Sequence, residues 1–151
     1  MAKLSARTVR IMRIIVLAIS AVNAVCALVC GILFITAPNG SLMHMQTLTS
    51  LLSNFPLRDV FFKNFLWIGI AMLLMLGVPN SVAVLLTFHK RRPRYGFQVN
   101  AGAFLLAWCL IEIIWLPNPA VWCYFVVALA HIALALLLTR VAHTGARQPH
   151  V

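Results

Sequence analysis

Glu112 is the side chain in this sequence that is best placed to do chemistry. It is one of only two acidic residues in the chain, and it lies within a long apolar run. An ionised carboxylate is costly in hydrocarbon, so we expect Glu112 to face protein or water, or to carry a proton. Trp108 precedes it by four residues, which places both side chains on one helix face. The pair fits a proton relay or the floor of a polar pocket for a lipid-like ligand, but a polar contact that joins helices is the favoured interpretation.

Tyr124 is the nearest partner that the sequence offers to Glu112. Glu112 lies five residues before Pro117, and Tyr124 lies five residues after Pro119. At 1.5 Å per residue, each side chain is about 7.5 Å along its helix from the turn between them. We therefore predict a hydrogen bond between the Tyr124 hydroxyl and the Glu112 carboxyl group.

A second set of polar residues is expected deeper in the apolar runs. His131 lies roughly 10 Å deeper than Glu112 by the same rise per residue, and Asn23 and Asn80 also fall near the middle of their runs. The three side chains predict a buried polar layer, which would position helices or line a small cavity. Positioning is the favoured role. The candidate cavity residues are thus Glu112, Trp108, Tyr124, His131, Asn80 and Asn23.

Other kinds of site find no support in the sequence. It contains no zinc-type histidine cluster, no glycine-rich phosphate loop and no nucleophile elbow. Cys26 and Cys30 are one helical turn apart within an apolar run, which lacks the exposed setting that a redox pair needs. We expect no metal and no cofactor, and a non-catalytic protein is favoured over an enzyme.

The elements that carry these residues are apolar runs long enough to cross a bilayer. Of the 151 residues, 63% are hydrophobic and 9% are charged, and the mean hydropathy is +0.99. A soluble domain of this size cannot bury so much apolar surface. Four runs of 18 residues or more predict transmembrane helices, at residues 14–37, 65–88, 95–116 and 120–139. The predicted fold is all-α, with one antiparallel four-helix transmembrane domain over residues 1–151.

Three local patterns add detail to this topology. In residues 41–55 the apolar side chains recur at near-helical spacing with polar side chains between them, which predicts a short amphipathic helix in the first extracytoplasmic loop. Gly77 and Pro79 lie inside the second run and predict a kink, because proline removes a backbone hydrogen bond. Residues 117–119 form a short Pro-Asn-Pro turn, so the last two helices must be antiparallel neighbours.

The charge of the chain indicates an orientation in the membrane. Twelve Lys and Arg residues against two acids give a net charge of +10. Ten of the twelve lie at the N-terminus, in the second loop or at the C-terminus, and the positive-inside rule places these segments in the cytoplasm. This pattern explains the basic residues without nucleic acid. We expect a multi-pass protein of a bacterial cytoplasmic membrane. The ten residues are Lys3, Arg7, Arg10, Arg13, Lys90, Arg91, Arg92, Arg94, Arg140 and Arg147.

Several short motifs resemble a loosely defined group of small bacterial four-span membrane proteins, some of which are called DoxX-like and most of which have no assigned function. The resemblance implies a four-span fold of the same kind. DoxX proteins usually carry a lysine after the first span, which this sequence lacks, so their quinone and sulfur redox chemistry is not expected here. The motifs are Gly31-Ile32-Leu33-Phe34 with Pro38, Phe55-Pro56, Arg58-Asp59, Gly77 with Asn80, Arg91 to Arg94, and Trp108 with Glu112.

Together these features favour a small non-catalytic membrane protein, either an accessory subunit or a lipid-facing helper. Its expected partners are the lipid bilayer and either another membrane protein or a second copy of the chain, with no role for nucleic acid. The alternative is a homo-oligomeric transporter or lipid-substrate membrane enzyme that uses the intramembrane carboxyl group of Glu112.

Overall fold

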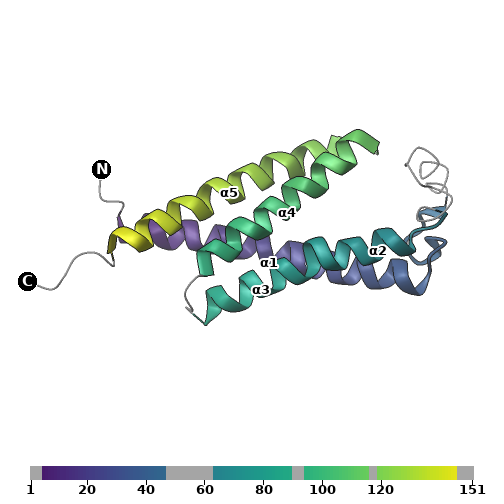
Figure 1. Ribbon diagram of the computed structural model, residues 1–151, viewed down its shortest axis with the longest axis horizontal. Helices are drawn as coiled ribbons and strands as arrows, with labels where there is room; N and C mark the ends of the chain where they lie inside the picture. Colours follow the sequence, from purple (N-terminus) through teal and green to yellow (C-terminus); the bar gives the residue numbers. More distant parts are fainter. Residues whose placement is uncertain (1–4, 47–62, 90–93, 116–118, 146–151) are drawn as a thin grey trace, which may run out of the picture.

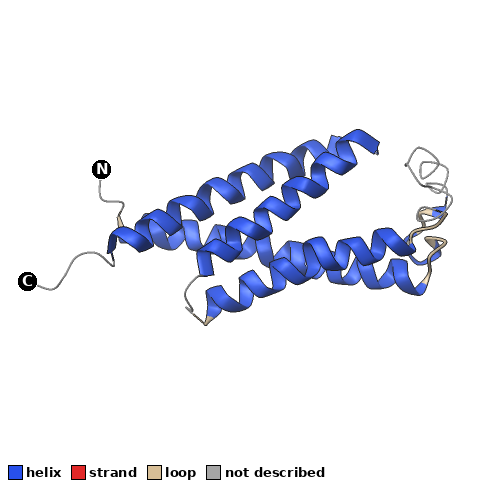
Figure 2. Cartoon of the chain, viewed as in Figure 1, coloured by secondary structure: helices blue, strands red, loops and turns tan. Residues whose placement is uncertain are grey.

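The protein is all-helical in the parts that the structure describes. The computed structural model describes residues 5–46, 63–89, 94–115 and 119–145. Its main elements are α1 (Ala6–Thr36), α2 (Leu66–Met72), α3 (Val78–Phe88), α4 (Arg94–Trp115) and α5 (Pro119–Gly145). Figure 1 shows their arrangement, and no strand occurs in the described ranges (Figure 2).

Four helical stretches are long and apolar enough to cross a membrane, as the sequence predicts. They cover Ala6–Thr36, Leu66–Phe88, Tyr95–Trp115 and Pro119–Thr144. The chain is therefore a small multi-pass integral membrane protein with a four-helix bundle. The first helix begins eight residues before the predicted span, and the last continues past residue 139, because helical structure does not end where the apolar run ends.

The start of α1 explains its extra length. Ser5 is the N-cap residue, and its hydroxyl oxygen accepts a hydrogen bond from the Thr8 amide at 3.1 Å. Such a cap satisfies one of the amide groups left unpaired at a helix start. The 31 residues of α1 span about 46 Å at 1.5 Å per residue, which exceeds a hydrocarbon core of roughly 30 Å. Its first turns, with Arg7 and Arg10, therefore extend beyond the apolar stretch.

The second stretch is interrupted where the sequence predicts an irregularity. Between α2 and α3, the segment Leu73–Gly77 is a π-helical turn, labelled η3. The Val78 amide donates to the carbonyl of Leu73, five residues back, and Pro79 follows as one of the first residues of α3. A π turn inserts an extra residue into the helix. The regular hydrogen bonding is thus interrupted next to Gly77 and Pro79, and the kink itself stays a prediction.

The predicted amphipathic helix is wrong in its first turn. Ser41–Met43 forms a single 3-10 turn, labelled η1. The turn ends at His44, whose φ of 53° is left-handed, and a left-handed residue cannot continue an α-helix. Residues 47–55 of the predicted helix lie outside the described residues.

The helices pair in two groups. α5 packs along α4 as the predicted hairpin, α2 packs on α1, and α3 contacts both α1 and α4. Figure 1 shows that the α4–α5 pair and the α1–α2 pair spread apart toward one end. We call this the Glu112 end. The opposite end, where α1 begins and α5 ends, we call the basic end.

Small residues allow the closest contacts between helices. A Cβ atom added to Gly69 on α2 would lie 2.8 Å from the carbonyl oxygen of Gly31 on α1, and one added to Gly102 on α4 would lie 2.8 Å from Ile132 on α5. Such close approach at glycine is typical of helix contacts in membranes.

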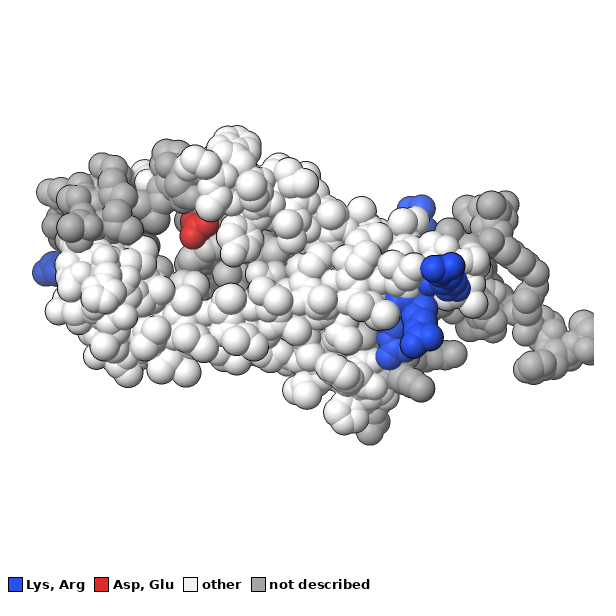
Figure 3. Space-filling model, turned by 180° about the vertical axis from the view of Figure 1, so that it is seen from behind, with Lys and Arg blue, Asp and Glu red and all other residues white. Residues whose placement is uncertain are grey.

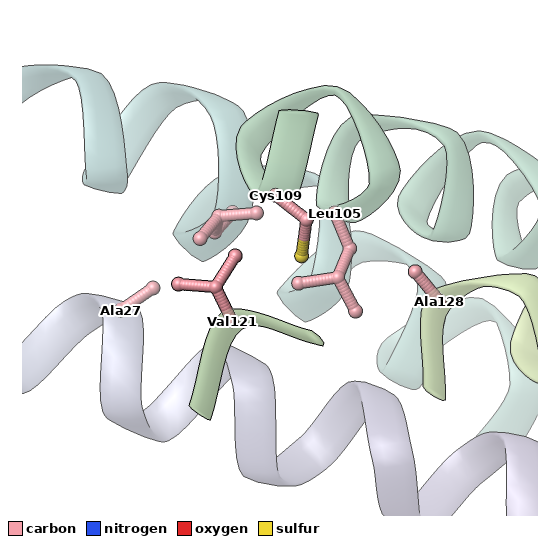
Figure 4. Packing of buried hydrophobic residues seen from close by; sticks show 6 residues of the cluster. Ala27, Leu105, Cys109, Val121 and Ala128 are labelled. Atoms are coloured by element: carbon pink, nitrogen blue, oxygen red, sulfur yellow. The ribbon is translucent and has the colours of Figure 1, made fainter. Parts of the chain in front are cut away.

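Buried apolar side chains fill the space between the four stretches. One cluster joins all of them near the middle of the bundle (Figure 4). A second lies toward the basic end, and a third contains the stacked rings of Phe34 and Phe65, whose centroids are 4.8 Å apart. The central cluster consists of Ala27, Leu76, Leu105, Cys109, Val121 and Ala128.

Candidate functional site

Among the described residues, Gln98, near the start of α4, is the polar side chain whose hydrogen bonds reach the most helices. It is fully buried. Its Oε1 accepts a hydrogen bond from the Ser20 hydroxyl of α1 at 2.6 Å. Its Nε2 donates to the Thr87 hydroxyl at 2.9 Å and to the Ala83 carbonyl oxygen at 3.1 Å, both on α3. One amide group therefore links α4 to two other stretches.

His131 of α5 completes a four-helix connection. Its Nε2 lies 3.1 Å from Oε1 of Gln98, and the ring is fully buried. The Ala83 carbonyl oxygen can only accept, so it fixes the Gln98 amide with Nε2 toward α3 and Oε1 toward His131. Because Oε1 can only accept, Nε2 of His131 must carry the proton. The geometry thus assigns the Nε2–H tautomer, which leaves a lone pair on Nδ1.

Thr87 extends the network toward the basic end. Its hydroxyl donates to the Ala83 carbonyl oxygen at 2.7 Å, which leaves the hydroxyl oxygen free to accept from Gln98. Its own carbonyl oxygen accepts from Nη2 of Arg13 on α1 at 3.0 Å. Thr87 lies in the last turn of α3, where carbonyl groups lack helical partners and a cation is favourable. Arg13 therefore caps α3 from a neighbouring helix.

The predicted polar layer is buried as expected, but its members are not bonded to one another. Asn80 is fully buried and its Nδ2 donates to the Leu76 carbonyl oxygen at 2.8 Å, one turn back on its own stretch. Asn23 is buried. Its side chain forms no hydrogen bond with any residue that the structure describes. His131 instead bonds to Gln98, which was not among the predicted site residues.

Glu112 lies apart from this network. It is about 21 Å along α4 from Gln98, at 1.5 Å per residue. Its Oε1 accepts from the indole Nε1 of Trp108 at 2.9 Å, so the bond stays within α4. The residue is half-buried. In Figure 3 the only red group is Glu112, the single acid among the described residues, and it lies at the edge of a hollow in the surface.

The predicted hydrogen bond between Glu112 and Tyr124 is wrong. The Tyr124 side chain is 50% exposed and forms no hydrogen bond within the described ranges. Equal depth along two helices does not decide which way a side chain points around its axis. The partner of Glu112 is Trp108, which shares its helix face as the spacing predicts.

Charged residues are separated along the bundle. Among the basic side chains that can be placed, Arg7, Arg10, Arg13 and Arg140 gather at the basic end, and Lys63 lies at the other end (Figure 3). Three of the four basic residues of the second loop, Lys90, Arg91 and Arg92, lie outside the described residues.

Three residues of the network were missed by sequence reasoning. Ser20 and Thr87 are common in membrane helices, and Gln98 lies so close to the start of its apolar run that it resembles an interfacial residue. A signal was present, because Gln98 precedes Ala101, Leu105 and Cys109 at helical spacing. All four side chains are buried, so the face that carries small residues also carries the glutamine.

The chemistry open to these groups is hydrogen bonding. No group of three or more metal-binding side chains occurs in the described part of the chain. All four cysteines are free. Compared with models of known protein families, with curated proteins and with solved structures, the chain matches none.

Proposed function

We propose that this membrane protein is a non-catalytic accessory subunit or lipid-facing helper in the bacterial cytoplasmic membrane. The observation that carries the proposal is the Gln98 network. Ser20, Thr87 and His131 use their polar atoms to hold four helices together, so the centre of the bundle serves as a scaffold. Its work would then be done through the outer helix faces, which contact lipid or another membrane protein.

The outer surface supports this role. Large apolar side chains cover it on every helix, as expected for a protein in contact with lipid tails or with apolar partner helices. Several of these exposed side chains are aromatic. The examples on α4 and α5 are Phe97, Phe104, Trp122 and Tyr124.

The proposed orientation places both termini in the cytoplasm. The clustering of Arg7, Arg10, Arg13 and Arg140 at one end supports it, because positively charged residues remain on the cytoplasmic side. Reporter proteins fused to the C-terminus distinguish the two orientations. A reporter that is active only in the cytoplasm should be active there, and activity of a periplasmic reporter would contradict the proposal.

The role itself is tested by isolating the protein from native membranes in mild detergent and identifying by mass spectrometry everything that stays bound. The proposal expects a partner protein or bilayer lipids. The Gln98→Leu variant serves as a matched sample, because it weakens the scaffold and should release a partner that recognises the assembled bundle. Purification of a homo-oligomer with one defined metabolite would contradict the accessory role.

A second candidate is a homo-oligomeric transporter or a lipid-substrate enzyme that uses Glu112. The observation in its favour is the position of the carboxyl group, which lies half-buried beside Trp108 at the edge of a hollow (Figure 3). No basic side chain is bonded to it within the described residues, so its second oxygen is available to a ligand.

The two candidates differ in what Glu112→Gln does. Gln keeps an oxygen that accepts from Trp108 but removes the carboxylate, so it separates structure from ligand binding. Loss of a bound metabolite in this variant, with an unchanged Tyr124→Phe control, would favour the second candidate. The same bound molecules in wild type and Glu112→Gln would leave only the first.

A further inference from the structure

Within the part of the chain that the structure describes, two buried polar atoms inside the bundle have no hydrogen-bond partner. They are Nδ1 of His131 on α5 and Oδ1 of Asn80 on α3. Both side chains are 0% exposed. Buried polar atoms in proteins are nearly always paired, with protein or with ordered water. An unpaired atom in such a place therefore calls for an explanation.

Both atoms are hydrogen-bond acceptors. Nδ1 of His131 carries the lone pair of the Nε2–H tautomer, because Nε2 must donate to Oε1 of Gln98. The amide nitrogen of Asn80 donates to the carbonyl oxygen of Leu76, which fixes the amide with its oxygen as the unpaired atom. The missing partner must therefore be a donor, and two acceptors cannot satisfy each other.

His131 belongs to the Gln98 network, and Asn80 lies beside that network on α3 without being bonded to it. Asn80 lies one turn before Ala83, whose carbonyl oxygen accepts from Gln98, and Gln98 in turn accepts from His131. Gly102 brings α4 close to the imidazole, since a Cβ atom there would lie 3.5 Å from Cγ of His131 and 2.8 Å from Cγ1 of Ile132. Asn80 also follows the π turn η3, and π turns occur frequently at functional sites because they disturb regular backbone pairing.

We propose that His131 Nδ1 and Asn80 Oδ1 form a shared internal hydration site in the middle of the bundle. A water molecule has two protons and can donate to both acceptors, and buried waters commonly pair otherwise unsatisfied polar groups. A metal ion fits less well, because no described carboxylate or thiolate is bonded to either residue to offset its charge. The site does not depend on the accessory role, since it follows from the bundle interior alone.

The site is tested by solid-state NMR on the full chain in lipid bilayers, with ¹⁵N-labelled histidine and asparagine, with ¹³C-labelled valine and leucine, and with magnetisation transferred from water. His131→Gln identifies the His131 signals. The expected result is a neutral imidazole protonated at Nε2, with rapid transfer from water to Nδ1. The exposed rings of His44 and His143 show the transfer rate expected for groups in contact with water. The buried methyl groups of Val16 and Leu138 show the rate expected for dry groups without such contact.

Asn80→Leu then tests whether the site is shared. Removing one acceptor should slow transfer from water to Nδ1 of His131 several-fold, whereas Asn100→Leu, the same change at an exposed position of α4, should leave it unchanged. The Nε2–H signal of His131 reports that the Gln98 bond, and hence the fold, persists in each variant. Transfer to Nδ1 no faster than to the dry methyl groups would overturn the proposal, and equal transfer in Asn80→Leu would overturn the shared site.

Discussion

The region around Gln98 and the Glu112 end use polar groups in different ways. Around Gln98, hydrogen bonds run from one helix to the next and link α1, α3, α4 and α5. At the other end, the bond between Trp108 and Glu112 begins and ends on α4. There the helices are held by apolar contacts such as the Phe34–Phe65 stack, and the two helix pairs spread apart.

This difference shows that a polar residue inside a membrane protein is not by itself a helix connector. Gln98 connects helices because its amide has both donors and acceptors and lies on the face shared by three neighbours. Glu112 offers oxygens only, and its partner is a turn away on the same helix. Stability should therefore depend far more on the amide than on the acid.

The largest expected effect is that of Gln98→Leu. It leaves the buried Ser20 hydroxyl and the Nε2–H of His131 without partners, and it removes the donor to Thr87. A single hydrogen bond between membrane helices contributes modestly, but leaving buried polar groups unpaired adds to the loss. We therefore expect the free energy of unfolding to fall by about 2–4 kcal/mol. Unfolding in mixed micelles with increasing denaturing detergent measures it.

Asn100→Leu is the matched control for that variant. Asn100 is exposed on the same helix, two residues further along, so its loss should change the free energy of unfolding by less than about 0.5 kcal/mol. Equal effects of the two substitutions would show that the network does not hold the helices together.

Gly69→Ala is expected to have the next largest effect. The added Cβ would lie 2.8 Å from the Gly31 carbonyl oxygen and 2.9 Å from Cβ of Phe34, so α1 and α2 must move apart. Overpacking of this kind costs about 1–3 kcal/mol. Gly96→Ala at an exposed position of α4 is the control and should be neutral or slightly stabilising in the same unfolding assay. A neutral Gly69→Ala would mean that the close contact is not needed.

Trp108→Phe should have a smaller effect at the Glu112 end. It keeps an aromatic ring but removes the indole N–H, which should lower the free energy of unfolding by about 0.5–1.5 kcal/mol. Because Trp108 and Gln98 lie about 15 Å apart along α4, the losses in the double variant Gln98→Leu/Trp108→Phe should add. A double-mutant cycle measures this. Strong coupling would mean that the two regions act as one unit.

Tyr124→Phe is expected to have the smallest effect. The hydroxyl group has no partner in the described part of the structure and the side chain is half exposed, so the free energy of unfolding should change by less than about 0.5 kcal/mol. Thermal unfolding in detergent is sufficient to measure it. A clear loss of stability would restore the hydrogen bond to Glu112 that the sequence suggested.

The fold was more accessible from the sequence than the network. Apolar runs locate membrane helices because hydrocarbon excludes polar backbone and side chains, so the four stretches were predicted closely, except where capping by Ser5 and continued helix past residue 139 lengthened them. Burial of His131, Asn23 and Asn80 followed from the same reasoning. The depth of a residue in the membrane depends only on its position along its apolar run, which can be read directly from the sequence.

The partners of these residues could not be predicted in the same way. A hydrogen bond depends on how each helix is rotated about its axis, and periodicity alone does not relate the rotation of one helix to that of another. Hence Gln98 was missed as the partner of His131, and Tyr124 was paired with Glu112 although it points outward. The resemblance to DoxX-like proteins stays a prediction.

The position of Gln98 in the third stretch has a consequence for biosynthesis. When α4 leaves the ribosome, Ser20 and Thr87 have already been made, so two of its partners can be waiting in the bilayer. His131 follows 33 residues later in the chain and is the last donor to reach Oε1. The first three stretches can therefore assemble around Gln98 before the fourth stretch completes the bundle.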